Sequence, residues 1–305
     1  MNKKNKYEYW RIAIRKHSDD IAGNKEPFRV LKNPFGYWAA DPFIAEKDGL
    51  YYVFAELCDK NAGRGKIGVL VIDENGKTKK RWKVIMDNGH HMSFPNVFCR
   101  DGEYYMMPES NLVNKLSLFR VVEFPYKWEE TVLIDGERFC DSVFLEDDVI
   151  LSYNDFSDDK SQIILGCKDG VFEKIGETPD RDRKLRPAGK VISEKDGVYL
   201  IPLQDCGEYY GRAILFTELR PGIGDGDAEA KVVFELNSEN VKTVGYKSKL
   251  CGMHTYNYDG NLEIIDLKSY EFSFTIWFRK KRAEIRGFVM RAGSKIKRTL
   301  LPKRK

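Results

Sequence analysis

The sequence lacks several motifs that identify common classes of enzyme and metalloprotein. None of its six cysteines belongs to a C-x-x-C pair or stands at zinc-finger spacing from one of the four histidines. A P-loop pattern and a G-x-S-x-G nucleophile motif are also missing. These absences argue against a P-loop nucleotide-binding protein and an α/β-type serine hydrolase. We therefore expect no metal and no cofactor.

Long apolar runs are missing as well. The chain opens on charged and polar residues with no apolar segment behind them, so we expect neither a secretory signal nor a transmembrane helix. The cysteines are then expected to be reduced thiols, mostly buried, in a cytoplasmic protein.

The sequence is rich in residues that favour β-sheets. Hydrophobic residues make up 42% of the chain and aromatic residues 13%, whereas long stretches of helical periodicity are scarce. The 305 residues are enough to bury a sizeable core. We therefore predict an all-β fold.

Two stretches of the chain, 38–56 and 92–109, repeat one pattern. Each has an apolar strand, an Asp-Gly turn, an aromatic strand and a closing glutamate. The turn recurs about every 50 residues, which is the length of a four-stranded propeller blade. Its positions are Asp48, Asp101, Asp196 and Asp259, and Asp147-Asp148, without the glycine, takes the place of the third turn. We predict a five-bladed β-propeller over residues 7–278, closed by an N-terminal strand at 7–15, with a β-sandwich as the alternative fold.

The hairpins of such a propeller bring particular side chains to one end of its axis. The first strand of each blade lines the axis, and its start and the end of the returning strand share a face. The positions that converge at the starts of the first strands are Asp41, His91, Ser93, Asp141, Arg186 and His254. The returning strands add Glu56, Glu109, Gln204 and Asp205, and Trp38 could stack on a sugar ring.

Carboxylates gathered in this way shift one another's pKa values, which suits acid–base chemistry on glycans. We expect Asp41 to act as base or nucleophile, with Glu109 or Asp141 as its catalytic partner. Arg186 and His254 would hold the substrate, and Arg186 would suit the phosphates of a sugar nucleotide. Structural alternatives stay open, because Asp41 could cap a turn and His254 could be a core histidine.

Eight short motifs occur in an order that resembles a known family. They are WAADPF at 38–43, HMSFP at 91–95, MPES at 107–110, CDS at 140–142, RPAG at 186–189, QDC at 204–206, YGR at 210–212 and HTYN at 254–257. Together they resemble the propeller domain that precedes the transferase domain in plant glucosamine inositolphosphorylceramide transferases, and its stand-alone bacterial relatives in polysaccharide gene clusters. The resemblance implies a role in making a surface polysaccharide or glycolipid.

A more distant resemblance is to the five-bladed propellers of glycoside hydrolase families 43 and 32. It implies that Asp41 is a base aspartate at the start of the first blade. Those enzymes place a second aspartate at the start of the second blade, where this chain has Phe94. The transferase domain of the plant proteins is also missing from this chain.

Three functions follow. The first is glycosyl transfer or a related glycan-modifying reaction at the mouth. The second is a non-catalytic sugar-binding module that assists a partner glycosyltransferase. The third is a glycoside hydrolase.

The last residues form a basic tail. Residues 279–305 contain twelve lysines and arginines but one acid, with apolar residues at helical spacing. This pattern predicts either a solvated tail or a segment that docks on an anionic membrane surface at the inner face of the membrane. Nucleic acid is not expected as a partner, because the rest of the chain is acidic.

Overall fold

Tight hairpin turns of aspartate and glycine set the repeat of the fold. The computed structural model describes residues 6–60, 63–154, 161–178, 185–223, 228–272, 277–278, 281–282 and 285. Both residues of three predicted turns have positive φ angles: 53° and 72° at Asp48-Gly49, 50° and 81° at Asp101-Gly102, and 54° and 73° at Asp196-Gly197. Two consecutive positive φ angles make a type I′ turn, whose twist matches that of paired strands. The predicted hairpins therefore form for a local reason.

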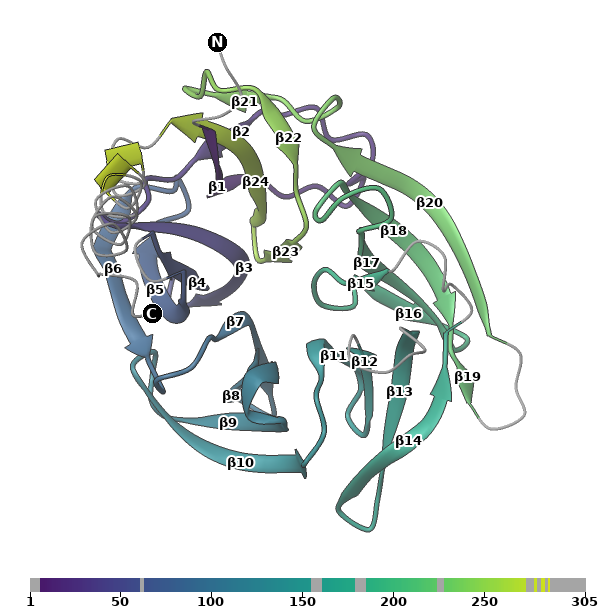
Figure 1. The fold of residues 1–305 in the computed structure, drawn as a ribbon. Helices are drawn as coiled ribbons and strands as arrows, with labels where there is room; N and C mark the ends of the chain where they lie inside the picture. Colours follow the sequence, from purple (N-terminus) through teal and green to yellow (C-terminus); the bar gives the residue numbers. More distant parts are fainter. Residues whose placement is uncertain are drawn as a thin grey trace, which may run out of the picture. The chain divides into compact units, whose positions relative to one another are not determined.

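Strands joined by these turns make five sheets around an axis (Figure 1). Blade 1 contains β3 (Tyr37–Lys47), β4 (Leu50–Asp59), β5 (Gly65–Ile72) and β6 (Thr78–Met86). Blade 2 contains β7 (Ser93–Arg100), β8 (Glu103–Glu109), β9 (Lys115–Glu123) and β10 (Lys127–Asp135), with the short 3-10 helix η2 (Asn111–Val113) between β8 and β9. Blade 3 contains β11 (Cys140–Glu146), β12 (Val149–Asn154), β13 (Ser161–Lys168) and β14 (Val171–Glu177), extended by β19 (Gly222–Ile223).

The first strand is interrupted in the last two blades. In blade 4 it consists of β15 (Arg186–Pro187) and β16 (Ser193–Lys195), which both pair with β17 (Val198–Asp205), followed by β18 (Ala213–Arg220) and β20 (Glu229–Asn237). In blade 5, β22 (Leu250–Gly252) and β23 (Tyr256–Asp259) both pair with β24 (Leu262–Phe272), and the sheet continues with β1 (Lys6–Lys16), β2 (Phe28–Val30) and β21 (Thr243–Val244).

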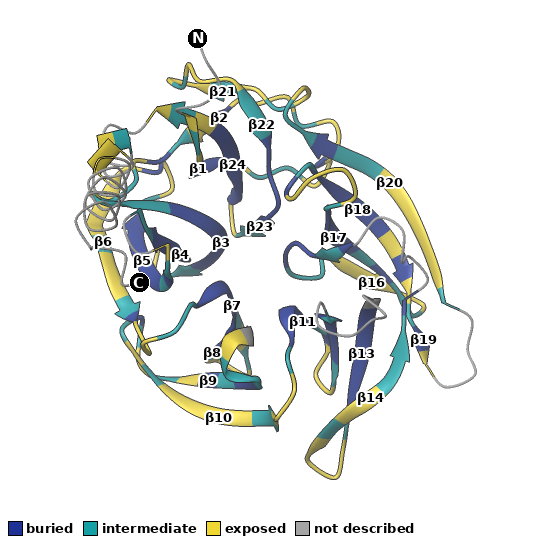
Figure 2. Ribbon diagram, in the orientation of Figure 1, coloured by how far each residue is buried: buried dark blue, intermediate teal, exposed yellow. Residues whose placement is uncertain are grey.

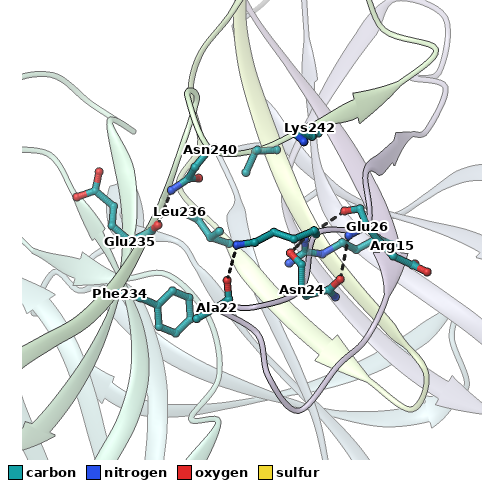
Figure 3. A pocket seen from close by; sticks show the side chains of 11 residues that line it. Arg15, Ala22, Asn24, Glu26, Phe234, Glu235, Leu236, Asn240 and Lys242 are labelled. Carbon is teal, nitrogen blue, oxygen red and sulfur yellow. Dashed lines mark hydrogen bonds between the residues drawn. The ribbon is translucent and has the colours of Figure 1, made fainter.

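The N-terminal strand closes the ring. β1 lies between β24 and β2, so strands from both ends of the propeller share one sheet, as predicted. The loop after β1 is fastened by Arg15, whose guanidinium forms a buried ion pair with Glu263 and donates to the carbonyl oxygens of Asn24 at 2.9 Å and Glu26 at 3.2 Å. This loop and β20 of blade 4 line a small pocket of about 120 Å³ (Figure 3).

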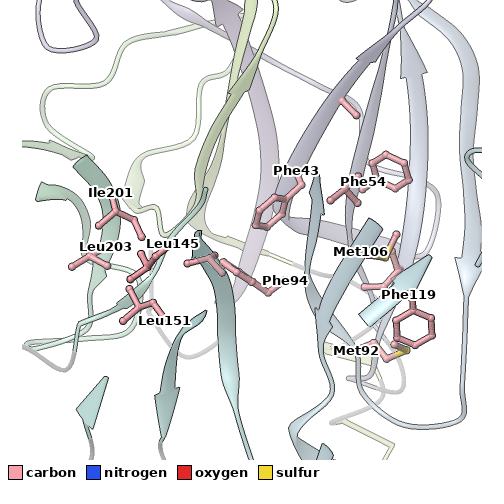
Figure 4. Close-up of a cluster of buried hydrophobic side chains, with 14 of the residues drawn as sticks. Phe43, Phe54, Met92, Phe94, Met106, Phe119, Leu145, Leu151, Ile201 and Leu203 are labelled. Carbon is pink, nitrogen blue, oxygen red and sulfur yellow. The ribbon is translucent and has the colours of Figure 1, made fainter. Parts of the chain in front are cut away.

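Apolar residues of the inner strands form the core. In Figure 2 the strands near the axis are mostly buried, whereas β6, β10, β14 and β20 at the outer edges are largely exposed. The largest cluster crosses from blade 1 to blade 4 (Figure 4). Its centre contains Phe43 and Phe94, whose rings meet edge-to-face with centroids 4.9 Å apart. Burying each aromatic side chain contributes about 2 to 3 kcal/mol. Packing between blades therefore supports the ring.

The chain divides into two units. The propeller covers residues 10–269, compared with the 7–278 expected, and the second unit contains residues 1–9 and 270–305. In the second unit the structure describes the outer ends of β1 and β24 and a few helical residues, and the predicted basic tail at 279–305 lies almost entirely outside the described residues. Among the described residues, no helix is long and apolar enough to span a membrane.

Candidate active site

Three matching bulges shape the mouth of the propeller. In blade 1, Ala40 pairs with Glu56 and Phe43 with Phe54, so β3 has one more residue than β4 across this interval. The same extra residue occurs at the start of β7 and of β11. A bulge of this kind bends the strand and redirects a side chain.

The residue inside each bulge has a left-handed backbone. The φ angles are 50° at Asp41, 44° at Phe94 and 46° at Asp141. Aspartate tolerates this region better than most residues do, whereas phenylalanine rarely adopts it. Each such residue stores of order 1–3 kcal/mol of strain, which is typical of functional sites.

Asp41 is buried at the centre of the mouth with every polar atom in contact. Its Oδ1 accepts a hydrogen bond from the Thr255 hydroxyl at 3.2 Å and lies 3.4 Å from Nε2 of His254. Its Oδ2 accepts from the backbone N–H of Phe94 at 3.2 Å, and its own N–H donates to Asp266 at 3.1 Å. The carboxyl group is therefore held in one orientation.

Burial raises the pKa of Asp41 from 3.8 to about 6. Loss of solvation is the largest cause, and the charges of Asp141 and Asp266 add to it, while His254 opposes it. Asp41 is thus a carboxylate at neutral pH that can accept a proton readily, as a general base must.

Asp266 organises the imidazole beside Asp41. This residue of β24 is fully buried and accepts hydrogen bonds from the backbone N–H groups of His254 at 2.8 Å and Thr255 at 3.1 Å. Its other oxygen contacts Nδ1 of His254, and the imidazole stacks on Trp10 with ring centroids 4.1 Å apart. Burial alone would lower the pKa of His254, but Asp266 and Asp41 raise it, so the charged imidazolium is favoured.

Asp41, His254 and Asp266 are also the one set of three potential metal ligands among the residues that the structure describes. Their ligand atoms all lie within 4.8 Å of one another. Nδ1 of His254 contacts Asp266, and Nε2 lies 3.4 Å from Oδ1 of Asp41, so both ring nitrogens already face a carboxylate oxygen. The geometry favours a hydrogen-bonded chain of carboxylate, imidazole and carboxylate.

Arg186 joins two further carboxyl groups. Its Nη2 lies 2.6 Å from Oδ2 of Asp141 and 3.2 Å from Oε2 of Glu109, and Gln204 donates to the same Asp141 oxygen at 2.8 Å. Burial and then the charge of Asp141 raise the pKa of Glu109 well above its usual range, while Arg186 opposes the shift. Glu109 also shares a hydrogen bond with Asp141. Glu109 therefore holds a proton, which makes it a candidate general acid.

Glu56 and His91 lie close to each other at the mouth, beside the carboxyl groups described above. Nδ1 of His91 accepts a hydrogen bond from the backbone N–H of Gly65 at 3.0 Å, which leaves the ring proton on Nε2, 3.7 Å from Oε1 of Glu56. Burial raises the pKa of Glu56 well above its usual range, and burial lowers that of His91. Both shifts favour the uncharged form of the group.

Comparison with known proteins identifies the family. Residues 32–248 match the family described as glucosamine inositolphosphorylceramide transferase 1, N-terminal. The chain belongs to this family. It is 28% identical over 212 residues to glucosamine inositolphosphorylceramide transferase 1 of Arabidopsis thaliana. This alignment covers 65% of this chain and 28% of the relative. The protein of that name from Oryza sativa subsp. indica is 29% identical over 191 residues, 58% of this chain and 25% of the relative. The chain thus spans about a quarter of these relatives' length.

Solved glycoside hydrolases share the fold. The catalytic domain of a family 62 α-L-arabinofuranosidase from Coprinopsis cinerea covers 88% of this chain and aligns over 98% of its own length, with a TM-score of 0.51 and 10% identity. A family 62 hydrolase in complex with xylotriose covers 85% of this chain and aligns over 97% of its own length, with a TM-score of 0.52 and 12% identity. At this identity the likeness concerns the fold alone.

The remaining candidate residues of this family member lie around the carboxyl cluster. Ser93 is buried and pairs with Glu109 across β7 and β8. Trp38 is half-buried on β3, opposite Cys58 and three residues before Asp41.

Asp205 faces its own blade. Its carboxylate accepts hydrogen bonds from Arg212 at 2.7 and 3.1 Å and from the N–H of Gly207 at 2.9 Å. It therefore fastens the loop 206–212, which carries Tyr210. The ring of Tyr210 is 42% exposed and meets His254 edge-on at 5.1 Å, so it offers a surface for a bound sugar at the mouth.

The sequence argument missed Asp266, Thr255 and Trp10. One signal for Asp266 was available, because it is an acid directly between the apolar residues Ile265 and Leu267. An ionisable residue at such a position needs a partner, and here the partners are Asp41 on β3 and the segment between β22 and β23 that carries His254 and Thr255.

Proposed function

We propose that the mouth of the propeller is a catalytic site for glycosyl transfer or a related glycan modification. The observation that carries the proposal is the pair of buried carboxyl groups in different protonation states, Asp41 with a pKa of about 6 and Glu109 with a pKa well above its usual range. One ionised and one protonated carboxyl group is the combination that chemistry at a glycosidic bond requires.

In the proposed mechanism each group has one task. Asp41 takes the proton of the attacking hydroxyl group, and the imidazolium of His254, 3.4 Å away, stabilises Asp41 while it is a carboxylate. Glu109 gives its proton to the departing oxygen. Arg186 then stabilises the Glu109 carboxylate, because its Nη2 lies 3.2 Å from Oε2 of Glu109, while the negative charge of Asp141 favours the protonated Glu109 of the resting site.

The charge of the mouth favours a sugar that carries no negative charge. Arg186 is already paired with the Asp141 carboxylate at 2.6 Å, so little of its charge is left for the phosphates of a sugar nucleotide. Asp41, Asp141 and Asp266 outnumber the two cations Arg186 and His254, and a diphosphate would be repelled. A neutral sugar or an amino sugar fits this balance, with Tyr210 under the ring.

Membership of this family supports a role in glycan synthesis. Its curated relatives are named glucosamine inositolphosphorylceramide transferase 1, and two solved structures of similar fold are named as family 62 hydrolases. We infer a role for this chain in making a surface polysaccharide or glycolipid on the cytoplasmic side.

A second candidate is a sugar-binding module without catalysis. It is favoured by the extent of the match, because the family covers the N-terminal part of relatives about four times as long as the alignment. In that case the propeller would present a glycan to a partner glycosyltransferase.

Binding and turnover measured on the same variants separate these functions. The probes are monosaccharides, including glucosamine and N-acetylglucosamine, followed by thermal shift, and p-nitrophenyl glycosides followed by release of nitrophenol. If the site is catalytic, Asp41→Asn and Glu109→Gln bind the sugar as the wild type does but lose turnover. A binding module shows sugar binding without turnover in any variant. Release of nitrophenol by the wild type that requires an acceptor sugar assigns glycosyl transfer, whereas release in water alone, lost in both variants, would assign a glycoside hydrolase instead.

A further inference from the structure

The outer edge of blade 1 differs in charge from the other outer edges. β6 carries four exposed cations and no acid: Lys79, Lys80, Arg81 and Lys83. Lysine on an edge strand is a common protection against pairing with other chains. However, β10 combines one lysine with three acids, and β14 and β20 each combine one lysine with two acids. Protection of an edge therefore does not account for the uniform charge of β6.

An exposed aromatic residue lies beside this strand. Phe35, in the loop between β2 and β3, has 103% of its reference surface exposed, although a phenylalanine ring gains by leaving water. The indole N–H of Trp82 on β6 donates to the carbonyl oxygen of Lys32 at 3.0 Å, which fastens the loop to the strand. Loop and strand together line a groove of about 490 Å³ that includes Lys32, Phe35, Arg81 and Trp82.

Part of the positive charge on this surface is left without an acidic partner. Lys79 pairs with Asp73 at 3.0 Å, and Lys83 lies over the ring of Tyr126 at 4.2 Å. Arg81 and Lys32 have no carboxylate within ion-pair distance among the residues that the structure describes.

We propose that this surface, formed by Lys32, Phe35, Trp82 and the four cations of β6, docks the propeller on an anionic lipid bilayer. Cations along a strand edge would contact lipid headgroups, while Phe35 enters the boundary between headgroups and acyl chains. From Lys79 to Lys83 the extended strand runs about 13 Å, so the four charges are concentrated in a short segment that can contact one patch of anionic headgroups. The fully exposed ring beside them favours a bilayer over nucleic acid, whose backbone would use the charges but leave Phe35 in water.

Docking at this edge would also place the mouth near a lipid. The loop that carries Phe35 continues directly into β3, and Asp41 follows six residues later. A lipid-linked glycan could then reach the mouth without leaving the bilayer. The docking itself requires no catalysis at the mouth.

Co-flotation of the whole chain with vesicles tests the proposal. The wild type is expected to float with vesicles of phosphatidylcholine and phosphatidylglycerol but not with phosphatidylcholine alone. Arg81→Ala should lower the partition coefficient about fivefold, since a basic residue near an anionic surface contributes roughly 1 kcal/mol. Phe35→Ser should lower it about tenfold or more, because it removes the inserted ring.

Matched controls come from other outer strands. Lys231→Ala on β20 removes an exposed lysine, and Val171→Ser on β14 removes an apolar side chain that is 64% exposed. Both controls should float like the wild type. All variants keep residues 279–305, so any binding by the tail is common to them.

Three results would overturn the proposal. The first is a wild type that does not float with anionic vesicles. The second is equal flotation with both kinds of vesicle. The third is unchanged flotation of a variant that combines Phe35→Ser with alanine at all four cations of β6. Thermal melting of each variant guards against misfolding, and none of the replaced side chains is buried.

Discussion

Replacing Asp41 with asparagine is expected to make the folded protein more stable at neutral pH. The pKa of this carboxyl group rises from 3.8 to about 6 on folding, so the folded state binds its proton more tightly than the unfolded state does. Stability from this group is therefore fully present below pH 3.8 and is lost as the pH rises through about 6. At neutral pH the buried Asp41 carboxylate lowers the free energy of unfolding.

The size of the effect follows from the pKa shift. A rise from 3.8 to about 6 corresponds to about 3 kcal/mol at neutral pH. Asn in place of Asp41 removes this cost, but its amide cannot accept the hydrogen bonds of both Phe94 and Thr255, and losing one of them costs about 1 to 2 kcal/mol. We expect the Asp41→Asn variant to be about 1 kcal/mol more stable than the wild type at about pH 7, and about 1 kcal/mol less stable at about pH 4.

Urea unfolding, followed by tryptophan fluorescence at several pH values, measures the difference in stability between the variant and the wild type at both ends of this pH range. The free energies of the wild type and the variant should cross near the pKa of Asp41. If the two curves run parallel between about pH 4 and about pH 7, Asp41 does not titrate with a raised pKa and the argument for a buried base is wrong. The same variant should lose turnover, which would separate the stability of this site from its activity.

Three further substitutions test other parts of the site. Glu109→Gln should lower kcat by about 10²- to 10⁴-fold with little change in melting temperature, because it removes a transferable proton and keeps the shape; steady-state kinetics measure this. Asp266→Asn should destabilise the protein by about 3 to 5 kcal/mol in urea unfolding, since it leaves the His254 imidazolium without its buried counter-ion, and NMR titration should show a lower pKa for His254. Gly189→Ala should cost about 1 to 3 kcal/mol in urea unfolding, because the added Cβ would lie 1.9 Å from the carbonyl oxygen of Tyr256.

The parts of the fold that depend on local chemistry could be predicted from the sequence. The Asp-Gly pairs at 48–49, 101–102 and 196–197 form type I′ turns, for which this pair is a strong local signal, so their spacing indicated the blades and the strands beside them. The common start of the inner strands then predicted which blade contributes Asp41, Asp141, Arg186 and His254.

Contacts between distant segments could not be predicted in this way. Asp266 meets the N–H of Asp41 across 225 residues, and no spacing in the sequence indicates that contact. Asp205 was placed at the mouth from its position, but its carboxylate is bound by Arg212, seven residues later. Nothing in the residues around Phe94 indicates its positive φ, because the bulge is imposed by the register with β8.

The three bulges separate the shape of the mouth from its chemistry. Asp41, Phe94 and Asp141 have φ angles within a few degrees of one another, so each side chain leaves an equivalent backbone. A substitution at one of these positions can change charge or polarity without a new loop, and aspartate would suit the φ of Phe94 better than phenylalanine does. The side chain at one bulge position can therefore change during evolution while the backbone of the other blades keeps the shape of the mouth.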